Sequence, residues 1–217
     1  MNKIKRKYAV YLNNKDFLSS LVLSILILLF SLVINFYAGI YATERASNAV
    51  TDLILSNIRV YDVDLIFIYG PVFFYLFVAY ILIMRPHLIP FSLKSVGLFI
   101  LIRSIFISLT HIGPFPSQLV ISPANVVNYF TPGGDLFFSA HTGLPFLLAL
   151  IFWENIRLRI FFIASSLFFG TVVLMGHLHY SIDVLAAFFI TYTIYYIACA
   201  FFPKDKKIFA SGLESEN

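Results

Sequence analysis

Charged residues are scarce in this chain of 217 residues: Asp, Glu, Lys and Arg make up 12% of it, whereas hydrophobic residues make up 60%. The mean hydropathy is +0.88, which lies well outside the range of soluble domains. A composition so poor in charge excludes an ordinary soluble globular protein and indicates an integral membrane protein. The aromatic content of 18% fits lipid-facing helices with aromatic belts at the membrane interfaces.

Cysteine is almost absent as well, since Cys199 is the only one in the chain. No internal disulfide can form, and a single cysteine in an apolar segment does not indicate a cellular compartment. A cleavable signal peptide is not evident either, because the first apolar run is too long and lacks a small-residue cleavage site. That run is therefore expected to remain as the first membrane span.

Six apolar segments are long enough, at ~1.5 Å per helical residue, to cross most of a bilayer. They are residues 17–41, 65–84, 95–109, 136–153, 160–175 and 182–202. We therefore predict an all-α fold, a polytopic membrane protein built as a six-transmembrane-helix bundle, with no repeat and no second domain. The expected parts are a basic leader at residues 1–16, a catalytic membrane domain at 17–202 and a tail at 203–217. The first polar connection has room for a short interfacial helix around residues 47–58.

The distribution of basic residues predicts the orientation of the bundle. Of the 15 Lys and Arg residues, 12 fall on one side of the predicted spans, Arg45 and Arg59 fall on the other, and Arg103 lies within a span. Because cytoplasmic loops are rich in Lys and Arg, both termini are expected in the cytoplasm. The location would be a cell membrane, and the short loops suit a bacterial inner membrane. The net charge of +4 does not indicate a nucleic-acid partner, since the basic residues lie at loop ends rather than in one patch.

Two short polar clusters bracket the apolar hairpin made by the fourth and fifth predicted spans. The first, at residues 133–142, is Gly-Gly-Asp-Leu-Phe-Phe-Ser-Ala-His-Thr, and the second, at residues 176–183, is Gly-His-Leu-His-Tyr-Ser-Ile-Asp. Two antiparallel spans return the chain to its starting side, so both clusters are expected at the same, extracytoplasmic face. His141, His179 and Asp183 would converge there, although 38 and 4 residues separate them in the sequence.

These three side chains are suited to acid, base and nucleophilic chemistry. His179 and Asp183 are four residues apart and would share one face of a helix. A carboxylate can hold one imidazole nitrogen and fix the tautomer, which leaves the other nitrogen basic, as a nucleophile or general base requires. His141 would then protonate a leaving oxygen. The alternative is a buried polar network that merely bridges helices.

A metal site is the weaker interpretation of the same histidines. Zinc held by His141, His177 and His179 is conceivable, because His is a common zinc ligand. A His-x-His pair, however, suits a metal better on a strand than on a membrane helix, and the acid and base chemistry needs no metal. We therefore expect no metal and no cofactor.

Residues 139–142, Ser-Ala-His-Thr, and residues 177–184, His-Leu-His-Tyr-Ser-Ile-Asp-Val, carry a family resemblance. Together with the helix pair between them, they resemble the two signature motifs of the sphingomyelin synthase family, within the type 2 phosphatidic acid phosphatase superfamily. The resemblance covers roughly the C-terminal half of the chain. It implies that His179 is the nucleophile toward phosphorus, that Asp183 orients it and that His141 is the acid and base.

The chain also departs from the superfamily pattern. Ala140 replaces the usual Gly of Ser-Gly-His, which is a small change. The lipid phosphatases carry a Lys-Arg-Pro motif and a Ser-Arg pair before the second His, whereas the corresponding upstream residues here are Val172 and Val173. Binding a phosphomonoester dianion requires several cations, whereas a diester carries one charge and requires fewer. The departure therefore favours a phospholipid diester as the substrate.

Four further residues are candidates for substrate binding. Arg103 lies within a span, where charged residues usually face the bundle or a polar cavity, and the resemblance implies phosphate contact; a structural ion pair, for example with Asp135, is the alternative. Asp135 is either a helix N-cap or, as the resemblance implies, a headgroup contact. Ser139 and the neighbouring amides would hold phosphate oxygens at a helix N-terminus. His111 points either into the same cavity or out from a surface loop, and Tyr180 is interpreted as an interfacial aromatic.

These observations predict a membrane enzyme that cleaves a lipid phosphate ester through a phosphohistidine and transfers the phospho-headgroup to a lipid alcohol or to water. Its partner would be a membrane lipid. One alternative is a phosphatase acting on phosphatidic acid or a polyprenyl pyrophosphate, with Arg103 and Lys94 partly replacing the missing arginines. Another is a non-catalytic lipid-binding or transport protein, which the intact set of His141, His179 and Asp183 disfavours.

Overall fold

The computed structural model describes residues 3–119 and 136–213, and all regular structure within these ranges is helical. The prediction of an all-α membrane fold is therefore confirmed. The helices in chain order are α1 (Lys3–Asn13), α2 (Lys15–Glu44), α3 (Asp64–Met84), the 3₁₀ helix η1 (Pro86–Leu88), α4 (Ile89–Leu109), α5 (Ala140–Ile151), α6 (Ile156–Met175), α7 (Ser181–Phe201) and α8 (Pro203–Ser211).

Five helical segments of the described chain are long and apolar enough to cross a membrane: α2, α3, the continuous η1–α4 segment, α6 and α7. The fourth expected span is the shorter apolar helix α5, which has 12 residues. At ~1.5 Å per residue, α5 covers about 18 Å of a hydrocarbon core that is about 30 Å thick. Residues 136–139, expected to be helical, instead approach α5 as irregular chain.

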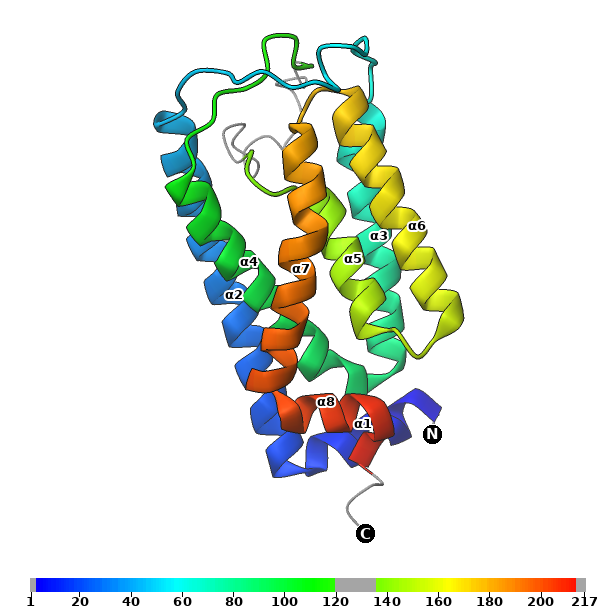
Figure 1. Ribbon diagram of the computed structural model, residues 1–217. Helices are drawn as coiled ribbons and strands as arrows, with labels where there is room; N and C mark the ends of the chain where they lie inside the picture. The colour runs from blue at the N-terminus through cyan, green and yellow to red at the C-terminus, as the bar shows by residue number, and fades with distance from the viewer. Residues whose placement is uncertain (1–2, 120–135, 214–217) are drawn as a thin grey trace.

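Helix α5 lies inside the bundle, packed against α6 and α7, while α2 runs along α4 and α4 also contacts α7 (Figure 1). The apolar side chains of α5 are deeply buried, and Leu147 and Ala149 are 0% exposed. The close approach at Gly143 requires a residue without a side chain, because a Cβ there would lie 2.8 Å from the Phe99 ring and 2.9 Å from the Thr191 hydroxyl. Phe99 belongs to α4 and Thr191 to α7, so this contact holds α5 between them.

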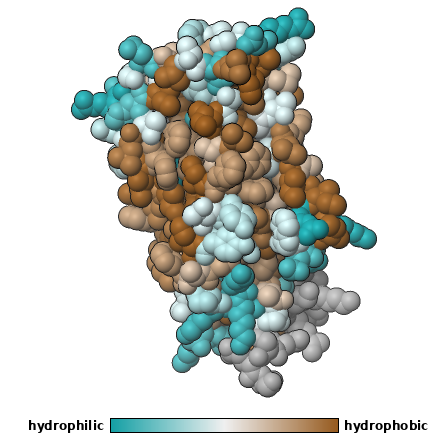
Figure 2. Space-filling model, in the orientation of Figure 1, coloured by the Kyte–Doolittle hydropathy of each residue, from teal (hydrophilic) through white to brown (hydrophobic). Residues whose placement is uncertain are grey.

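The outer surface of the bundle is apolar over its middle and polar at both ends, as Figure 2 shows for one face. Large apolar side chains are exposed along α2 and α3, including Phe30 at 59% and Phe73 at 70%. Water would not tolerate an apolar surface of this extent, whereas lipid chains would cover it. The surface therefore agrees with the membrane class that the composition predicts.

Helices α1 and α8 lie at one end of the bundle, and the beginnings of α5 and α7 lie at the other (Figure 1). At the α1 and α8 end, Lys94 of α4 is buried and bonds Asp205 of α8 at 2.6 Å and Ser20 of α2 at 2.8 Å. The suggestion that Lys94 assists phosphate binding is therefore wrong. Lys94 is paired with the Asp205 carboxylate, at the end of the bundle away from the beginnings of α5 and α7. Sequence spacing could not reveal this pair, since its members are 111 residues apart.

The connection between α2 and α3 contains turns, and the helix considered around residues 47–58 is not present. The chain completes only a single turn there, in which the Ser56 amide donates to the Asp52 carbonyl at 3.0 Å. The Oδ1 atom of Asp52 accepts hydrogen bonds from the amides of Ile54, at 2.9 Å, and Leu55, at 3.0 Å, and caps the start of this turn.

Candidate active site

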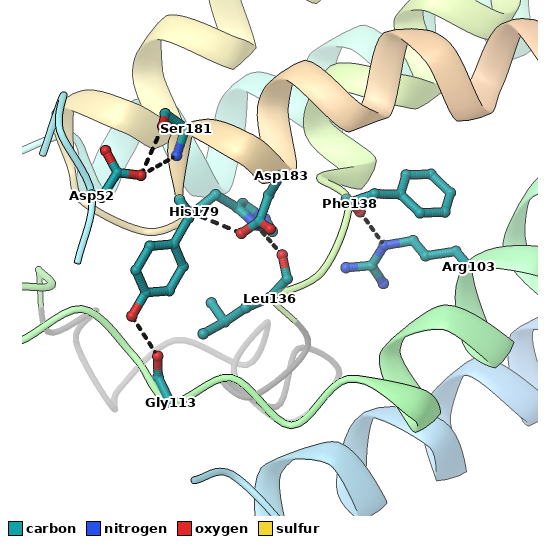
Figure 3. Close-up of polar contacts among 9 residues, drawn as sticks. Asp52, Arg103, Gly113, Leu136, Phe138, His179, Ser181 and Asp183 are labelled. Carbon is teal, nitrogen blue, oxygen red and sulfur yellow. Dashed lines mark hydrogen bonds and ion pairs between the residues drawn. The ribbon is translucent and has the colours of Figure 1, made fainter. Parts of the chain in front are cut away.

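His179 lies in the turn between α6 and α7, and its ring is held from one side (Figure 3). The Nδ1 atom is 2.8 Å from the carbonyl oxygen of Leu136 and 3.5 Å from Oδ2 of Asp183. A carbonyl oxygen can only accept a hydrogen bond, so Nδ1 carries the proton. In the neutral ring, Nε2 then keeps its lone pair, and His179 presents this nitrogen as a base or nucleophile.

Asp183 is fully buried in the first turn of α7. Its Oδ2 accepts a hydrogen bond from the Tyr180 amide at 2.9 Å, which satisfies one of the free amides at the start of the helix. Its Oδ1 has no hydrogen-bond partner among the described residues. The carboxylate thus caps α7 and also places negative charge beside the Nδ1 atom of His179.

The two motif segments are joined through their backbones. The Ser139 amide donates to the carbonyl of Asp183 at 3.2 Å, in addition to the bond between His179 and Leu136. Between these contacts, Phe138 has a φ of 36°, a conformation that is unusual for a bulky residue. Such strain costs about 1–3 kcal/mol and persists only where the surroundings impose it.

Arg103 of α4 is one of the groups that hold this strained segment. Its Nε donates to the Phe138 carbonyl at 3.0 Å, and its Nη1 lies 3.4 Å from Oδ1 of Asn35 on α2. Arg103 is 4% exposed, and Figure 3 shows it across the Leu136–Phe138 segment from His179. The buried cation therefore lies next to the segment that leads into α5 and within electrostatic range of His141.

The N-terminus of α5 carries two more of the sequence candidates. Ser139 is the N-cap residue, but its hydroxyl makes no capping bond and has no partner among the described residues. The ring of His141 stacks on Phe67 with a centroid distance of 4.4 Å and lines a narrow crevice with Pro71. His141 is also within electrostatic range of His179 and Arg103. The structure thus brings together His141, His179, Asp183, Arg103 and Ser139.

The remaining candidates are not brought into this group. The Nε2 atom of His111 is 3.0 Å from the Ser108 carbonyl, and the ring lies edge-on to Tyr41 at 5.4 Å, so its contacts are at the ends of α2 and α4. Asp135 lies outside the described residues. Within the described ranges, no group of three His, Cys, Asp or Glu side chains is arranged to hold a metal ion.

Asp52 lies near this site, and no pattern in the sequence indicated it. Its Oδ2 accepts from both the amide, at 2.7 Å, and the hydroxyl, at 2.8 Å, of Ser181, the first residue of α7. Burial acts to raise the pKa of Asp52, but the hydrogen bonds from Leu55, Ser181 and Ile54 outweigh it and hold the pKa below 3.8. Asp52 and Ser181 are 129 residues apart in the chain, so no local pattern could have indicated their contact.

Tyr180 is a buried residue that hydrogen-bonds two loops, whereas the sequence predicted an aromatic residue at the membrane interface. It is 1% exposed, its hydroxyl donates to the Gly113 carbonyl at 2.8 Å, and it accepts from the Val50 amide at 3.2 Å. Gly113 must itself be glycine, because a Cβ there would lie 2.2 Å from the Ser47 carbonyl oxygen. Tyr180 therefore fastens two loops to the start of α7.

His177 fixes the chain on the other side of His179. Its φ is 53°, its Nδ1 lies 2.8 Å from the Ser117 hydroxyl and its ring lies edge-on to Phe115. Burial lowers the pKa of His177 below 6.5, and the charge of Asp52 opposes this shift only in part. The backbone that carries His179 is thus held at His177 before it and at Ser181 after it.

A comparison with known proteins adds one match. Residues 133–200 match the family model described as PAP2 superfamily C-terminal, a range that contains His141, His179 and Asp183. No match to the chain was found among curated proteins or among solved structures. The match does not distinguish the sphingomyelin synthase-like branch. It supports membership of the type 2 phosphatidic acid phosphatase superfamily, and with it an activity of the lipid phosphatase or phosphotransferase type.

Proposed function

We propose that this protein cleaves a phospholipid diester through a phosphohistidine at His179 and transfers the phospho-headgroup to a lipid alcohol or to water. The observation that carries the proposal is which nitrogen of the His179 ring holds the proton. Its Nδ1 donates to the Leu136 carbonyl beside the Asp183 carboxylate. The free nitrogen is therefore Nε2, and the carboxylate is placed to stabilise the positive charge that the ring gains when Nε2 bonds to phosphorus.

The chemistry would proceed in two balanced steps. In the first, Nε2 of His179 attacks phosphorus, the ester bond to the leaving lipid breaks, and a protonated His141 gives its proton to the leaving oxygen. In the second, neutral His141 takes the proton from a lipid alcohol or from water as its oxygen attacks phosphorus. The phosphorus–nitrogen bond then breaks, and the neutral His179 ring is restored.

Arg103 and the amides at the start of α5 would stabilise the phosphate oxygens during both steps. Ser139 supports this role, because its buried hydroxyl leaves the α5 N-terminus uncapped by a side chain. Asp135, as an anionic contact for an amine headgroup, remains a proposal from the sequence, whereas the contacts of His111 with Ser108 and Tyr41 lie outside the group around His179. No protein carboxylate is needed to bind the phosphate.

The proposed preference for a diester rests on the small number of buried cationic side chains. Among the described residues, Lys94 and Arg103 are the buried Lys and Arg side chains, and Lys94 is bonded to Asp205 at the far end. Val172 and Val173 lie in a buried apolar cluster with Val63 and Leu178, and offer no charge. One guanidinium suits the single charge of a diester better than the double charge of a monoester.

The test is mass spectrometry of the products formed by purified protein in mixed micelles. Phosphatidylcholine, phosphatidylethanolamine and phosphatidic acid are supplied separately, with and without ceramide or diacylglycerol. Wild-type protein should release diacylglycerol from a diester, and a new phospholipid or a free phosphorylated headgroup would identify the acceptor. Phosphate released from phosphatidic acid alone would instead support the phosphatase.

Two histidine variants make the test specific to the proposed nucleophile. His179→Ala should lose turnover while remaining folded. His87→Gln is the matched control, since His87 stacks on Tyr11 at the opposite end of the bundle and should keep wild-type activity. Substantial turnover by His179→Ala would contradict the phosphohistidine.

We also propose that the site faces the extracytoplasmic side, with residues 1–16 and 203–217 in the cytoplasm. In a Cys199→Ser background, an impermeant thiol reagent applied to intact cells should label Asn57→Cys and spare Glu154→Cys. Both positions are exposed, Asn57 in the connection between α2 and α3 and Glu154 in the connection between α5 and α6, and these connections lie at opposite ends of the bundle (Figure 1). The reverse pattern would invert the orientation without affecting the proposed chemistry.

A further inference from the structure

A groove follows the seam between α3 and α6 on the lipid-facing side of the bundle. Its main part is a hollow of about 460 Å³ lined by Gly70, Phe73 and Phe77 on α3 and by Phe161, Ala164 and Phe168 on α6. The four phenylalanines are between 38% and 70% exposed, so the hollow opens onto the bilayer. Its walls are aromatic and aliphatic, apart from Ser165.

Phe77 connects this hollow with a second one, of about 370 Å³, nearer the end of the bundle that carries α1 and α8. Tyr80 and Met84 of α3 line it together with Arg85, the residue that follows α3, and on the other side it is lined by Arg157 of α6 and by Asn155, the residue before α6. We call the two hollows together the α3–α6 groove. The lining changes along the length of the groove from almost wholly apolar to basic.

Two arginines at the basic end of the groove are available to bind a ligand. Arg85 and Arg157 are both exposed, and neither guanidinium has a hydrogen bond or ion pair with another described residue. Glu154, the nearest carboxylate in the neighbouring surface hollow, makes no ion pair with Arg157. Arg159 differs, because it donates to the Trp153 carbonyl at 3.2 Å and lies over the Trp153 ring.

The dimensions of the groove match one membrane leaflet. From Gly70 to Arg85 the α3 helix rises about 22 Å at ~1.5 Å per residue. Half of a hydrocarbon core is about 15 Å thick, so the groove covers the acyl region of one leaflet and reaches the headgroup level. Phe74 and Phe169 line both the apolar hollow and the crevice that His141 lines, whereas the basic end of the groove shares no lining residue with that crevice.

We propose that the α3–α6 groove binds an anionic phospholipid of the leaflet opposite the His179 site, with an acyl chain along the phenylalanines and the phosphate at Arg85 and Arg157. Charge complementarity selects this occupant, since two unpaired guanidinium groups converge where the apolar walls end. Basic pockets between membrane helices are typical sites for anionic headgroups. This proposal does not depend on the reaction proposed for His179.

The bound lipid would hold α3 in place. In the described chain α3 packs mainly on α6 and η1, whereas α2 and α5 pack far more extensively with their neighbours. A lipid that lies between α3 and α6 adds apolar contact on both sides of this weak seam. Because a ligand that binds only the folded state stabilises it, the anionic lipid should raise the melting temperature.

Native mass spectrometry and thermal unfolding of the full chain in detergent test the proposal. Dioleoyl phosphatidylglycerol and dioleoyl phosphatidylcholine are titrated separately into wild-type protein, the double variant Arg85→Gln/Arg157→Gln and the double variant Arg159→Gln/Lys207→Gln. The first double variant should weaken phosphatidylglycerol binding at least about tenfold, to the level of phosphatidylcholine. The second removes the same charge from positions outside the groove and should bind as wild type does.

Ala164→Trp is an independent variant that fills the apolar part of the groove. It should weaken the binding of phosphatidylglycerol while leaving both arginines in place. Equal affinity of wild type for the two lipids, or equal losses in both charge-removed variants, would overturn the proposal. A protein dimer that Ala164→Trp abolishes, with no bound lipid, would show instead that a second copy of the chain occupies the groove.

Discussion

Two buried polar clusters lie at opposite ends of the bundle and differ in how completely their hydrogen bonds are made. In the cluster of Lys94, Asp205 and Ser20, each side chain bonds the other two. In the cluster around His179, buried polar atoms lack partners among the described residues, namely Oδ1 of Asp183 and the hydroxyls of Ser139 and Thr142. A closed network needs nothing further, but the hydroxyls of Ser92 and Ser95 on α4 also lack partners among the described residues, so the open carboxylate oxygen of Asp183 is what sets the His179 cluster apart.

The surroundings of the two clusters strengthen this distinction. Both non-glycine residues with positive φ in the described chain, Phe138 and His177, lie beside His179. Strain and unsatisfied polar atoms reduce stability and persist where function requires them. The Lys94 cluster should therefore matter for folding and the His179 cluster for turnover, and the two can be separated experimentally.

Asp183→Asn should give the largest effect and should act on turnover alone. The amide oxygen can still accept from the Tyr180 amide, but the negative charge beside His179 is lost. We expect kcat to fall between about a hundredfold and ten-thousandfold, the range typical of a positioned acid or base. The measurement is product formation alongside the melting temperature, which should stay near that of wild type. A large loss of stability with normal turnover per folded molecule would reverse the assignment of the two clusters.

Lys94→Met should lower stability and leave turnover unchanged, which is the reverse of the result expected for Asp183→Asn. It leaves the Asp205 carboxylate buried without its cation, and breaking a buried pair in this way costs about 3–5 kcal/mol. The melting temperature should fall clearly, while kcat of the protein that remains folded should not change. Replacing both partners, as in Lys94→Met/Asp205→Leu, should recover much of the stability. If the double variant were no more stable than the single one, the pair would not be the source of the loss.

Asp52→Asn should have an intermediate effect on stability and reveal how α7 is anchored. Because the pKa of Asp52 is lowered in the folded protein, its contribution to stability is full above pH 3.8 and is lost as pH falls through the folded value. Removing the charge weakens the bonds from Ser181, and we expect a loss of about 1–3 kcal/mol at neutral pH. Unfolding of wild type and variant should converge at acidic pH. A constant difference down to pH 2 would show that the carboxylate charge is not involved.

His177→Asn should give the smallest effect, and its distinguishing feature is a change in pH dependence. Burial lowers the pKa of His177, so the unfolded chain binds a proton near pH 6.5 that the folded protein does not bind. Stability should therefore decrease as pH falls below 6.5, and more weakly in the variant. Asparagine tolerates positive φ, so the backbone can be kept. Melting temperatures between pH 5 and 8 provide the measurement, and parallel curves would contradict the assignment.

Much of the fold was predictable because membrane helices are encoded locally. The apolar segments at residues 65–84 and 160–175 became α3 and α6 with boundaries shifted by at most four residues. The first four residues of the fourth expected span, 136–139, were not predictable in this way. Three of them are apolar, but the contacts of Leu136 and Phe138 with His179 and Arg103 hold them as irregular chain.

The sequence alone determined that this is a helical membrane protein and that His141, His179 and Asp183 lie at one end of one hairpin, because hydropathy and spacing are local properties. Only the tertiary structure decided which nitrogen of His179 is free, that Lys94 is neutralised by Asp205 and that Asp52 caps α7. Each of these depends on a polar partner between 43 and 129 residues away. In a low-dielectric interior such partners are set by how helices pack, and the local pattern of the chain contains no information about them.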